Sequence, residues 1–434
     1  MAPDSSLSLD RILQEITTTS NLGNLNHTLK TGLPKESRET ILSSALVSGQ
    51  DPLSVLDLRQ NTLGVLYILS ARLLATNAPV APQIVIGFCQ SFLPEQARMA
   101  PDRVTLLARG IIRLAQQHNN MTWAIAPLYN LLTRYPPDPS YLTAFHHLFL
   151  QACLTANSPA AALPILNHPI ANVSTAVSDL TYNDNLMYHY LGGVVLALLK
   201  RWPEAEEYFE ICVTAPGAVP AALQFEALKK LRLVQLISRG EVSPLPRYAH
   251  STLSRLLKNS IYTDFINAYP QNIQRLHALL DKEKQTFSSD KNLGLLMQAV
   301  ERAPRWTLKK LTATYVTLGL GDIARVVGGM QTEDEVRALI LSMIETGDIS
   351  AQISASGTVT FSDPPPQFTK DEVDSVLYSA QAQSAQLELL ELEVARSKDF
   401  ISKAIKNQDS GWSAHPDEEM YNMSNAWAEE AMFS

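Results

Sequence analysis

Apolar residues recur every three to four positions from Leu7 to Glu301, which is the period of amphipathic helices. Proline residues stand where these stretches begin or end, as expected of a residue that interrupts helices. The pattern predicts about a dozen helices in this part of the chain. The clearest are Thr62–Leu74, Asp102–Ala115, Thr122–Tyr135, Tyr141–Ala156 and Ala160–Leu166.

The strongest local signal in this region nearly matches the tetratricopeptide repeat, a pair of antiparallel helices. Gly193 and Ala205 are small where the two helices should cross closely, and Phe209 should fill the groove between neighbouring hairpins. His189 and Gly192 depart from the template, and other copies of the pattern are loosely spaced. We therefore expect an irregular solenoid of helical hairpins, which exposes long surfaces to partner proteins.

The pattern changes after Glu301, where shorter helices lead into alternating residues. Thr332 and Glu335 form a capping box at the start of one helix. A three-residue turn joins two alternating segments, which is typical of a β-hairpin. Three helices closed by a hairpin predict a winged helix, built from Arg305–Leu318, Asp322–Val327, Thr332–Glu345, Ile349–Ser354 and Thr358–Ser362. A small sheet leaves edges that accept another strand, so the hairpin is a candidate interface through Ile349, Ile353, Val359 and Phe361.

One long helix, Thr369–Asn407, is expected after three consecutive prolines, and it would be roughly 58 Å long at 1.5 Å per residue. Its apolar positions repeat every seven residues, so it needs partner helices to bury them. The candidate interface residues of this helix are Val373, Ala380, Leu387, Leu390, Val394 and Ile401. Residues 408–434 carry six acidic residues and no Lys or Arg, and we expect a mobile tail.

These patterns together predict an all-α chain: an irregular tetratricopeptide-like solenoid, a winged helix and a long C-terminal helix. The expected divisions are an N-terminal helical segment (1–50), the solenoid (51–301), the winged helix (302–363), the C-terminal bundle helix (369–407) and the acidic tail (408–434).

Composition agrees with a globular chain of several domains, because 46% of the 434 residues are hydrophobic and 18% are charged. The net charge of −8 disfavours nucleic acid and anionic membranes as partners. The three Cys lie too far apart for a disulfide framework or a zinc pair, which suits a reducing compartment. We expect neither a signal peptide nor a membrane span.

No motif for catalysis, metal or cofactor binding stands out. His146 and His147 are the only adjacent pair among nine His, and neighbours on a helix point in different directions. Gly319-x-Gly321-x-x-Ala324 fits a dinucleotide fingerprint, but no surrounding βαβ unit supports it, and we expect a turn between helices.

The charged and bulky residues outside these motifs have simpler interpretations. From Arg305 to Asp363 there are five basic and seven acidic side chains, so the winged helix should not bind DNA. Lys229-Lys230 and Lys309-Lys310 are expected on solvated helix faces. Cys212, Trp202 and Trp306 are expected to pack in the core.

A degenerate solenoid that runs directly into a winged helix resembles the PCI-domain proteins. These are scaffold subunits of the proteasome lid, the COP-9 signalosome and translation initiation factor three. Within that set, several stretches resemble the signalosome subunit 3 family, and they span about residues 50 to 405: Thr62–Leu66, Ala162–Leu166, Tyr188–Phe209, Leu228–Val242, Thr286–Gln298, Leu308–Asp322 and Met343–Ile349.

The resemblance implies a non-catalytic scaffold in the cytoplasm and nucleus, within the complex that removes Nedd8 from cullin-RING ubiquitin ligases. Other PCI subunits would be its direct partners, through winged-helix edges and a shared bundle of C-terminal helices, and cullin-RING ligases its indirect ones. The alternative is a scaffold subunit of the proteasome lid or of translation initiation factor three. The isopeptidase of the signalosome is a zinc enzyme in another subunit, and its two metal-binding His one residue apart have no counterpart here.

Overall fold

The computed structural model describes residues 9–19, 21–34, 37–46, 49–75, 80–327, 332–362 and 368–410. The chain divides into two compact units, Met1–Phe361 and Ser362–Ser434. The first unit is almost entirely helical, and the expected all-α class is confirmed.

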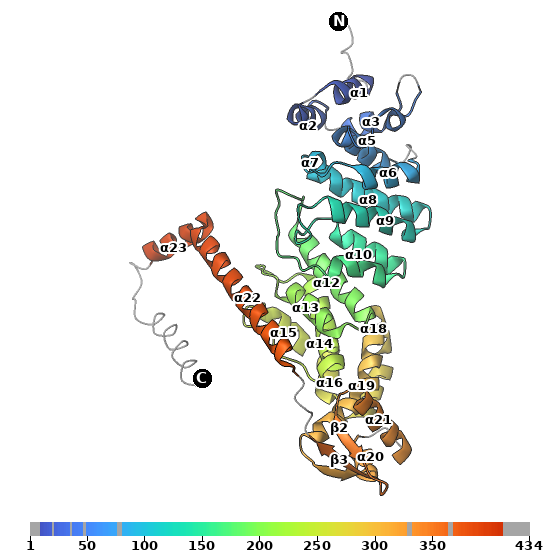
Figure 1. The fold of residues 1–434 in the computed structure, drawn as a ribbon, viewed down its shortest axis with the longest axis vertical. Coiled ribbons are helices and arrows are strands. Elements are labelled where there is room, and N and C mark those ends of the chain that lie inside the picture. Colours follow the sequence, from blue (N-terminus) through green and yellow to red (C-terminus); the bar gives the residue numbers. More distant parts are fainter. Residues whose placement is uncertain are drawn as a thin grey trace. The chain divides into compact units, whose positions relative to one another are not determined.

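Successive helices of the first unit pack as hairpins along its length (Figure 1). The first set is α1 (Leu9–Thr18), α2 (Leu22–Thr31), α3 (Arg38–Ser43), α4 (Pro52–Val55), α5 (Thr62–Leu74), α6 (Pro82–Ser91), α7 (Pro94–Ala97), α8 (Pro101–Gln117), α9 (Met121–Arg134) and α10 (His146–Thr155). The second set is η1 (Pro159–Ala162), α11 (Leu163–Leu166), α12 (Tyr182–Leu198), α13 (Trp202–Thr214), α14 (Ala222–Arg239), α15 (Ser251–Lys258), α16 (Ile261–Ala268), α17 (Ile273–Lys282), α18 (Lys284–Ser289) and α19 (Leu293–Thr312).

Two hydrophobic cores fill this unit, and α19 contributes to both. The larger core extends from Ile12 to Ala303, and the smaller one from Leu308 to Phe361. The predicted boundary at residue 302 therefore falls inside a continuous helix. Apolar side chains of α1, α2 and α3, among them Ile12, Leu29 and Leu42, also belong to the larger core.

The prediction that Arg305–Leu318 is a separate helix is wrong. Pro304 lies inside α19, which begins at Leu293 and ends at Thr312. Ala303, Thr307 and Leu308 are all buried on this helix, so packing on both sides of Pro304 offsets the hydrogen bond that proline removes. The residues beyond Thr312 are rich in β-branched and aromatic side chains, and they lead into a strand instead.

The winged helix contains a three-stranded sheet in the order β1-β3-β2, with α20 (Leu320–Val327) and α21 (Glu333–Glu345). Its strands are β1 (Thr317–Gly319), β2 (Ser350–Ile353) and β3 (Thr358–Ser362). Leu318 pairs with Val359 in the antiparallel β1–β3 ladder. The Thr332 half of the predicted capping box is present on α21, because the Thr332 side chain accepts a hydrogen bond from the Glu335 N–H.

The second unit contains two helices where one was predicted, α22 (Lys370–Arg396) and α23 (Lys398–Ser410). Ser397 has an extended backbone, and its hydroxyl accepts a hydrogen bond from the Phe400 N–H at 3.3 Å. Serine competes with the helix by capping a new one, which explains the break. The part of the predicted acidic tail beyond Ser410 lies outside the described residues.

A partly buried ion pair ties the N-terminal helices to the array. Arg103 on α8 is only 1% exposed and donates to both carboxylate oxygens of Glu39 on α3, at 3.0 and 2.7 Å. Burial alone would raise the pKa of Glu39, but the hydrogen bonds and charges of Arg103 and Arg38 outweigh it and lower that pKa. The carboxylate therefore stabilises the fold above its ordinary pKa, and this contribution is lost as the pH falls through the lowered value.

Replacing Glu39 with Gln is expected to lower the free energy of unfolding by about 1–2 kcal/mol at pH 7. This is below the cost of breaking a fully buried pair, because the Glu39 side chain is 45% exposed. The difference from wild type should shrink at an acidic pH below the lowered pKa of Glu39, where both chains lack the charge. Urea unfolding at both pH values would measure it, with the exposed Glu95→Gln on α7 as control. An equal difference at both pH values would contradict the ion-pair explanation.

Candidate interaction surfaces and a cationic groove

The α12–α13 hairpin brings together the residues predicted to pack the repeat. Ala205 and Phe209 are fully buried. A Cβ atom placed on Gly193 would lie 2.8 Å from the Phe209 ring, so this helix crossing tolerates no side chain there. Gly192, which departs from the repeat template, makes a similar approach, with 2.5 Å between its hypothetical Cβ and Tyr208. The two glycines therefore mark two close contacts between the helices, Gly192 with Tyr208 and Gly193 with Phe209.

The adjacent histidines occupy separate environments. His146 is buried, and its Nδ1 accepts a hydrogen bond from the Thr143 N–H at 2.9 Å. Burial lowers the pKa of His146 to about 3, so its ring stays neutral. His147 instead lies 3.6 Å from Asp184. Within the described ranges, no group of three or more His, Cys, Asp or Glu side chains is placed to hold a metal ion.

Lys229 and Lys230 do not lie on a solvated face, contrary to expectation. Lys229 on α14 makes ion pairs with Glu226 at 2.7 Å and with Asp290 at 2.9 Å. Lys230 is 4% exposed and donates to the side-chain oxygen of Asn292 at 2.5 Å. Burial lowers the pKa of Lys230 to about 8. The two lysines thus join α14 to the turn before α19.

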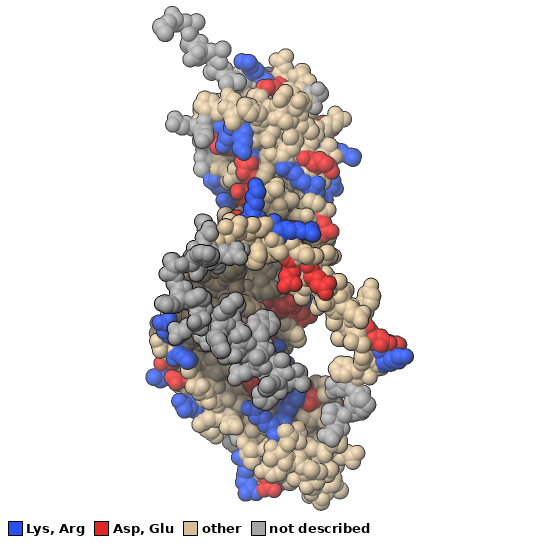
Figure 2. Space-filling model, turned by 90° about the vertical axis from the view of Figure 1, so that its left-hand side faces the viewer, with Lys and Arg blue, Asp and Glu red and all other residues tan. Residues whose placement is uncertain are grey.

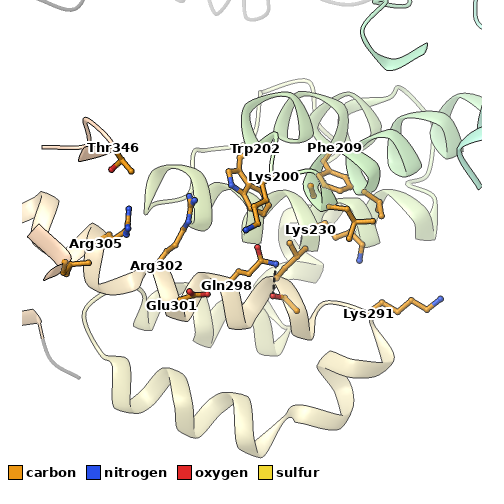
Figure 3. Close-up of a pocket in the computed structure, with 16 residues that line it drawn as sticks. Lys200, Trp202, Phe209, Lys230, Lys291, Gln298, Glu301, Arg302, Arg305 and Thr346 are labelled. Carbon is orange, nitrogen blue, oxygen red and sulfur yellow. Dashed lines mark hydrogen bonds between the residues drawn. The ribbon is translucent and has the colours of Figure 1, made fainter. Parts of the chain in front are cut away.

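A cavity of about 810 Å³ opens beside this network. Its walls come from α12, α13, α14, α19 and α21, and we call it the cationic groove. Figure 3 shows basic side chains extending from α19 and from the turns after α12 and α18. Its charged lining consists of Lys200, Lys230, Lys291, Arg302, Arg305 and the acidic Glu301. Sequence reasoning did not find this groove.

The dinucleotide alternative does not fit the sheet. Gly319 ends β1, which pairs antiparallel with β3, whereas the fingerprint needs parallel βαβ units. On the face drawn in Figure 2, Lys and Arg atoms are scattered among acidic and uncharged ones, with no continuous basic stripe.

The predicted winged-helix interface is partly wrong, because β3 is the central strand. Val359 and Phe361 on β3 are buried in the smaller core, as is Ile349 just before β2. The hairpin contributes only β2 as an edge of the described sheet, and the other edge is β1. Ile353 lies on β2, half-buried against the same core. Any strand added on the hairpin side must therefore pair with β2.

The two C-terminal helices expose large apolar side chains. No residue of α22 is buried, and the predicted interface residues Leu387, Val394 and Ile401 are 65%, 55% and 44% exposed. Val373, Ala380 and Leu390 are exposed as well. Leu389 and Leu392 lie off the predicted stripe and are equally exposed. A helix that is apolar on more than one side is typical of burial among several neighbours.

A helical-repeat array that continues through one helix into a winged helix defines a protein of the PCI class, and the PCI domain model matches residues 255–363. A second family model, COP9 signalosome complex subunit 3, N-terminal helical repeats, matches residues 26–253. The chain belongs to this family of PCI scaffold subunits. The signalosome interpretation is thereby supported over the proteasome lid and the initiation factor. No helix in the described ranges is both long and apolar enough to cross a membrane.

Curated relatives agree with this family. The chain is 26% identical over 393 residues to the COP9 signalosome complex subunit 3 of Dictyostelium discoideum, covering 87% of this chain and 93% of that protein. It is 28% identical over 393 residues to the protein of the same name from Drosophila melanogaster, covering 84% of this chain and 88% of that one. The similarity therefore extends over most of each chain.

Proposed function

We propose that this chain is a non-catalytic scaffold subunit that joins the other PCI subunits of a signalosome, and through that complex supports removal of Nedd8 from cullin-RING ligases. The exposed apolar surface of α22 and α23 is the main support, since such a surface calls for partner helices. The complex would operate in the cytoplasm and nucleus. Its isopeptidase would be another subunit.

A tagged full-length chain, expressed at its natural level and purified from cell extract, should recover the other signalosome subunits in stoichiometric amounts by mass spectrometry. Recovery of proteasome-lid or initiation-factor subunits instead would contradict the proposal. The tagged winged helix alone is no substitute, because α19 belongs to both cores.

The outer edge of β2 is a second proposed contact, where a neighbouring winged helix adds a strand. The Ser354 N–H bonds inward to the Thr358 carbonyl, so the N–H groups of residues 351 and 353 should face outward along the strand.

Replacing Ala351 with Pro should remove one outward donor, weaken the contact with the neighbouring subunit and leave the winged helix folded. Gln352→Pro is the matched control, because it removes an inward donor and should instead destabilise the sheet itself. Pull-down stoichiometry and circular dichroism would separate the two effects. Wild-type assembly of a folded Ala351→Pro chain would contradict the β2 contact.

A further inference from the structure

The cationic groove concentrates positive charge in a chain whose net charge is −8. Five of its lining side chains are basic and one, Glu301, is acidic. Among the described residues, Lys200 and Lys291 make no ion pair. The guanidinium of Arg302 donates to the Ile237 carbonyl at 3.1 Å and lies 5.9 Å from the Trp202 ring, and it makes no ion pair with a described residue. Arg305 is paired with Asp348 at 3.4 Å, but Lys200, Lys291 and Arg302 bring positive charge to the groove that no ion pair among the described residues neutralises.

The backbone at the two lysines gives an independent observation. Lys200 and Lys291 each follow a helix in the left-handed conformation, with φ of 60° and 56°. In both turns the next residue bonds back five positions, Arg201 to Leu196 at 2.9 Å and Asn292 to Phe287 at 2.9 Å. This is the Schellman motif, whose left-handed position favours glycine, or asparagine in second place. A lysine there is conformationally unfavourable, and both lysines line the groove.

Two further residues other than glycine are left-handed within the described ranges, and they provide a comparison. Asn119 and Asn157 occupy the same motif after α8 and α10. Asparagine tolerates this conformation, and neither residue lines the groove. Among the described residues with this left-handed backbone, the two that are neither glycine nor asparagine are thus the two lysines that line the groove. Because lysine is unfavourable in this backbone conformation, its presence at two separate helix ends indicates that its positive charge has a function there.

We propose that the cationic groove binds a small molecule carrying two phosphate groups, with Lys200, Lys291 and Arg302 as its main contacts. With Glu301 and the Asp348 partner of Arg305 subtracted, the groove keeps an excess of about three positive charges, which matches two phosphates of about −1.5 each. The guanidinium of Arg302 has the geometry to donate to phosphate oxygens in pairs. A cavity of about 810 Å³ falls within the range of small-molecule sites, which favours such a ligand over a peptide.

The buried lysine at the back of the groove supports this assignment. Lys230 donates to Asn292 and to the Asp290 carbonyl, neither of which is a charged group. Burial has lowered its pKa, so the charged form gains from any anion placed nearby. Binding of a phosphate ligand should therefore raise the pKa of Lys230.

Isothermal titration calorimetry of the full-length chain with inorganic pyrophosphate tests the proposal, at neutral pH and low ionic strength. The variant Lys200→Gly with Lys291→Gly removes both charges and places glycine where the backbone favours it. Its Kd for pyrophosphate should rise by at least about tenfold, the effect of losing one charge-assisted hydrogen bond. Its midpoint of thermal unfolding should be unchanged or higher, which excludes unfolding as the cause.

Asn119→Gly with Asn157→Gly is the matched control, since it makes the same backbone change away from the groove and should bind pyrophosphate as wild type does. Equal weakening in both variants, or no pyrophosphate binding by the wild-type chain, would overturn the proposal. Inorganic phosphate binding as tightly as pyrophosphate would overturn the assignment of two phosphates. A tetraglutamate peptide binding as tightly would show an acidic-peptide surface instead.

Discussion

Replacing Leu387, Val394 and Ile401 together with Asp is expected to expel the chain from its complex while the helical array stays folded. These side chains are exposed on α22 and α23. Replacing them with a charged residue should therefore not disrupt the hydrophobic cores of the chain. Burial of each such side chain against partner helices is worth about 1.5–3 kcal/mol, and three together would contribute several kcal/mol to assembly. Aspartate at these positions would also leave uncompensated charges in the bundle.

Pull-down of the triple variant from cells, with circular dichroism of the purified chain, measures both parts of this expectation. The control reverses three charges that lie off the stripe, Glu388→Lys, Glu393→Lys and Lys398→Glu, and should assemble nearly as well as wild type. If the stripe variant co-purifies at wild-type stoichiometry, the helices do not assemble the complex, and the basis of the proposed function is removed.

The repeating apolar pattern was sufficient to predict the elements whose formation is local. Thr62–Leu74 was predicted as a helix and forms α5 with the same bounds. Nearly every position of that helix is buried. The capping residue Thr332 and the hairpin strands β2 and β3 also follow from residue types within a few positions. The overall order of solenoid, winged helix and C-terminal helices followed from the change of period.

Long-range pairing explains what the pattern missed in the fold. β1 is a strand because Leu318 pairs with Val359, some forty residues away, and the β-branched residues before it favour a strand only weakly without that partner. That same pairing makes β3 central and removes Val359 from the candidate edge. The break at Ser397 is different, because serine caps a helix only when the backbone turns there, and the heptad spacing concealed that turn.

The cationic groove could not be predicted for a related reason. Lys200, Lys230, Lys291 and Arg302 are spread over about a hundred residues and meet only because α12, α14 and α19 stack (Figure 3). Considered by charge alone, the adjacent Lys229 and Lys230 are expected to be exposed to solvent on a helix face. Their burial depends on Asp290 and Asn292, which reach them from a distant turn.

Replacing Phe209 with Ala is expected to lower the free energy of unfolding of the helical array by about 3–5 kcal/mol. The Phe209 ring is fully buried and packs against the bare backbone of Gly193, so its removal leaves a cavity that the helix crossing cannot close. Ile211 on the same helix is 39% exposed, and Ile211→Ala should cost much less. Urea unfolding followed by circular dichroism compares the two.

The same contact predicts that substitutions at Gly193 and Phe209 have coupled effects on the free energy of unfolding. Gly193→Ala alone should destabilise the hairpin, because its methyl group would lie 2.8 Å from the ring. In a double variant with Phe209→Leu, the smaller side chain makes room for that methyl group. The double variant should then be more stable than the sum of the single effects predicts, with a coupling of about 0.5–3 kcal/mol. Strict additivity would mean that the two helices shift apart to admit the methyl group, and that the glycine is not what sets their crossing distance.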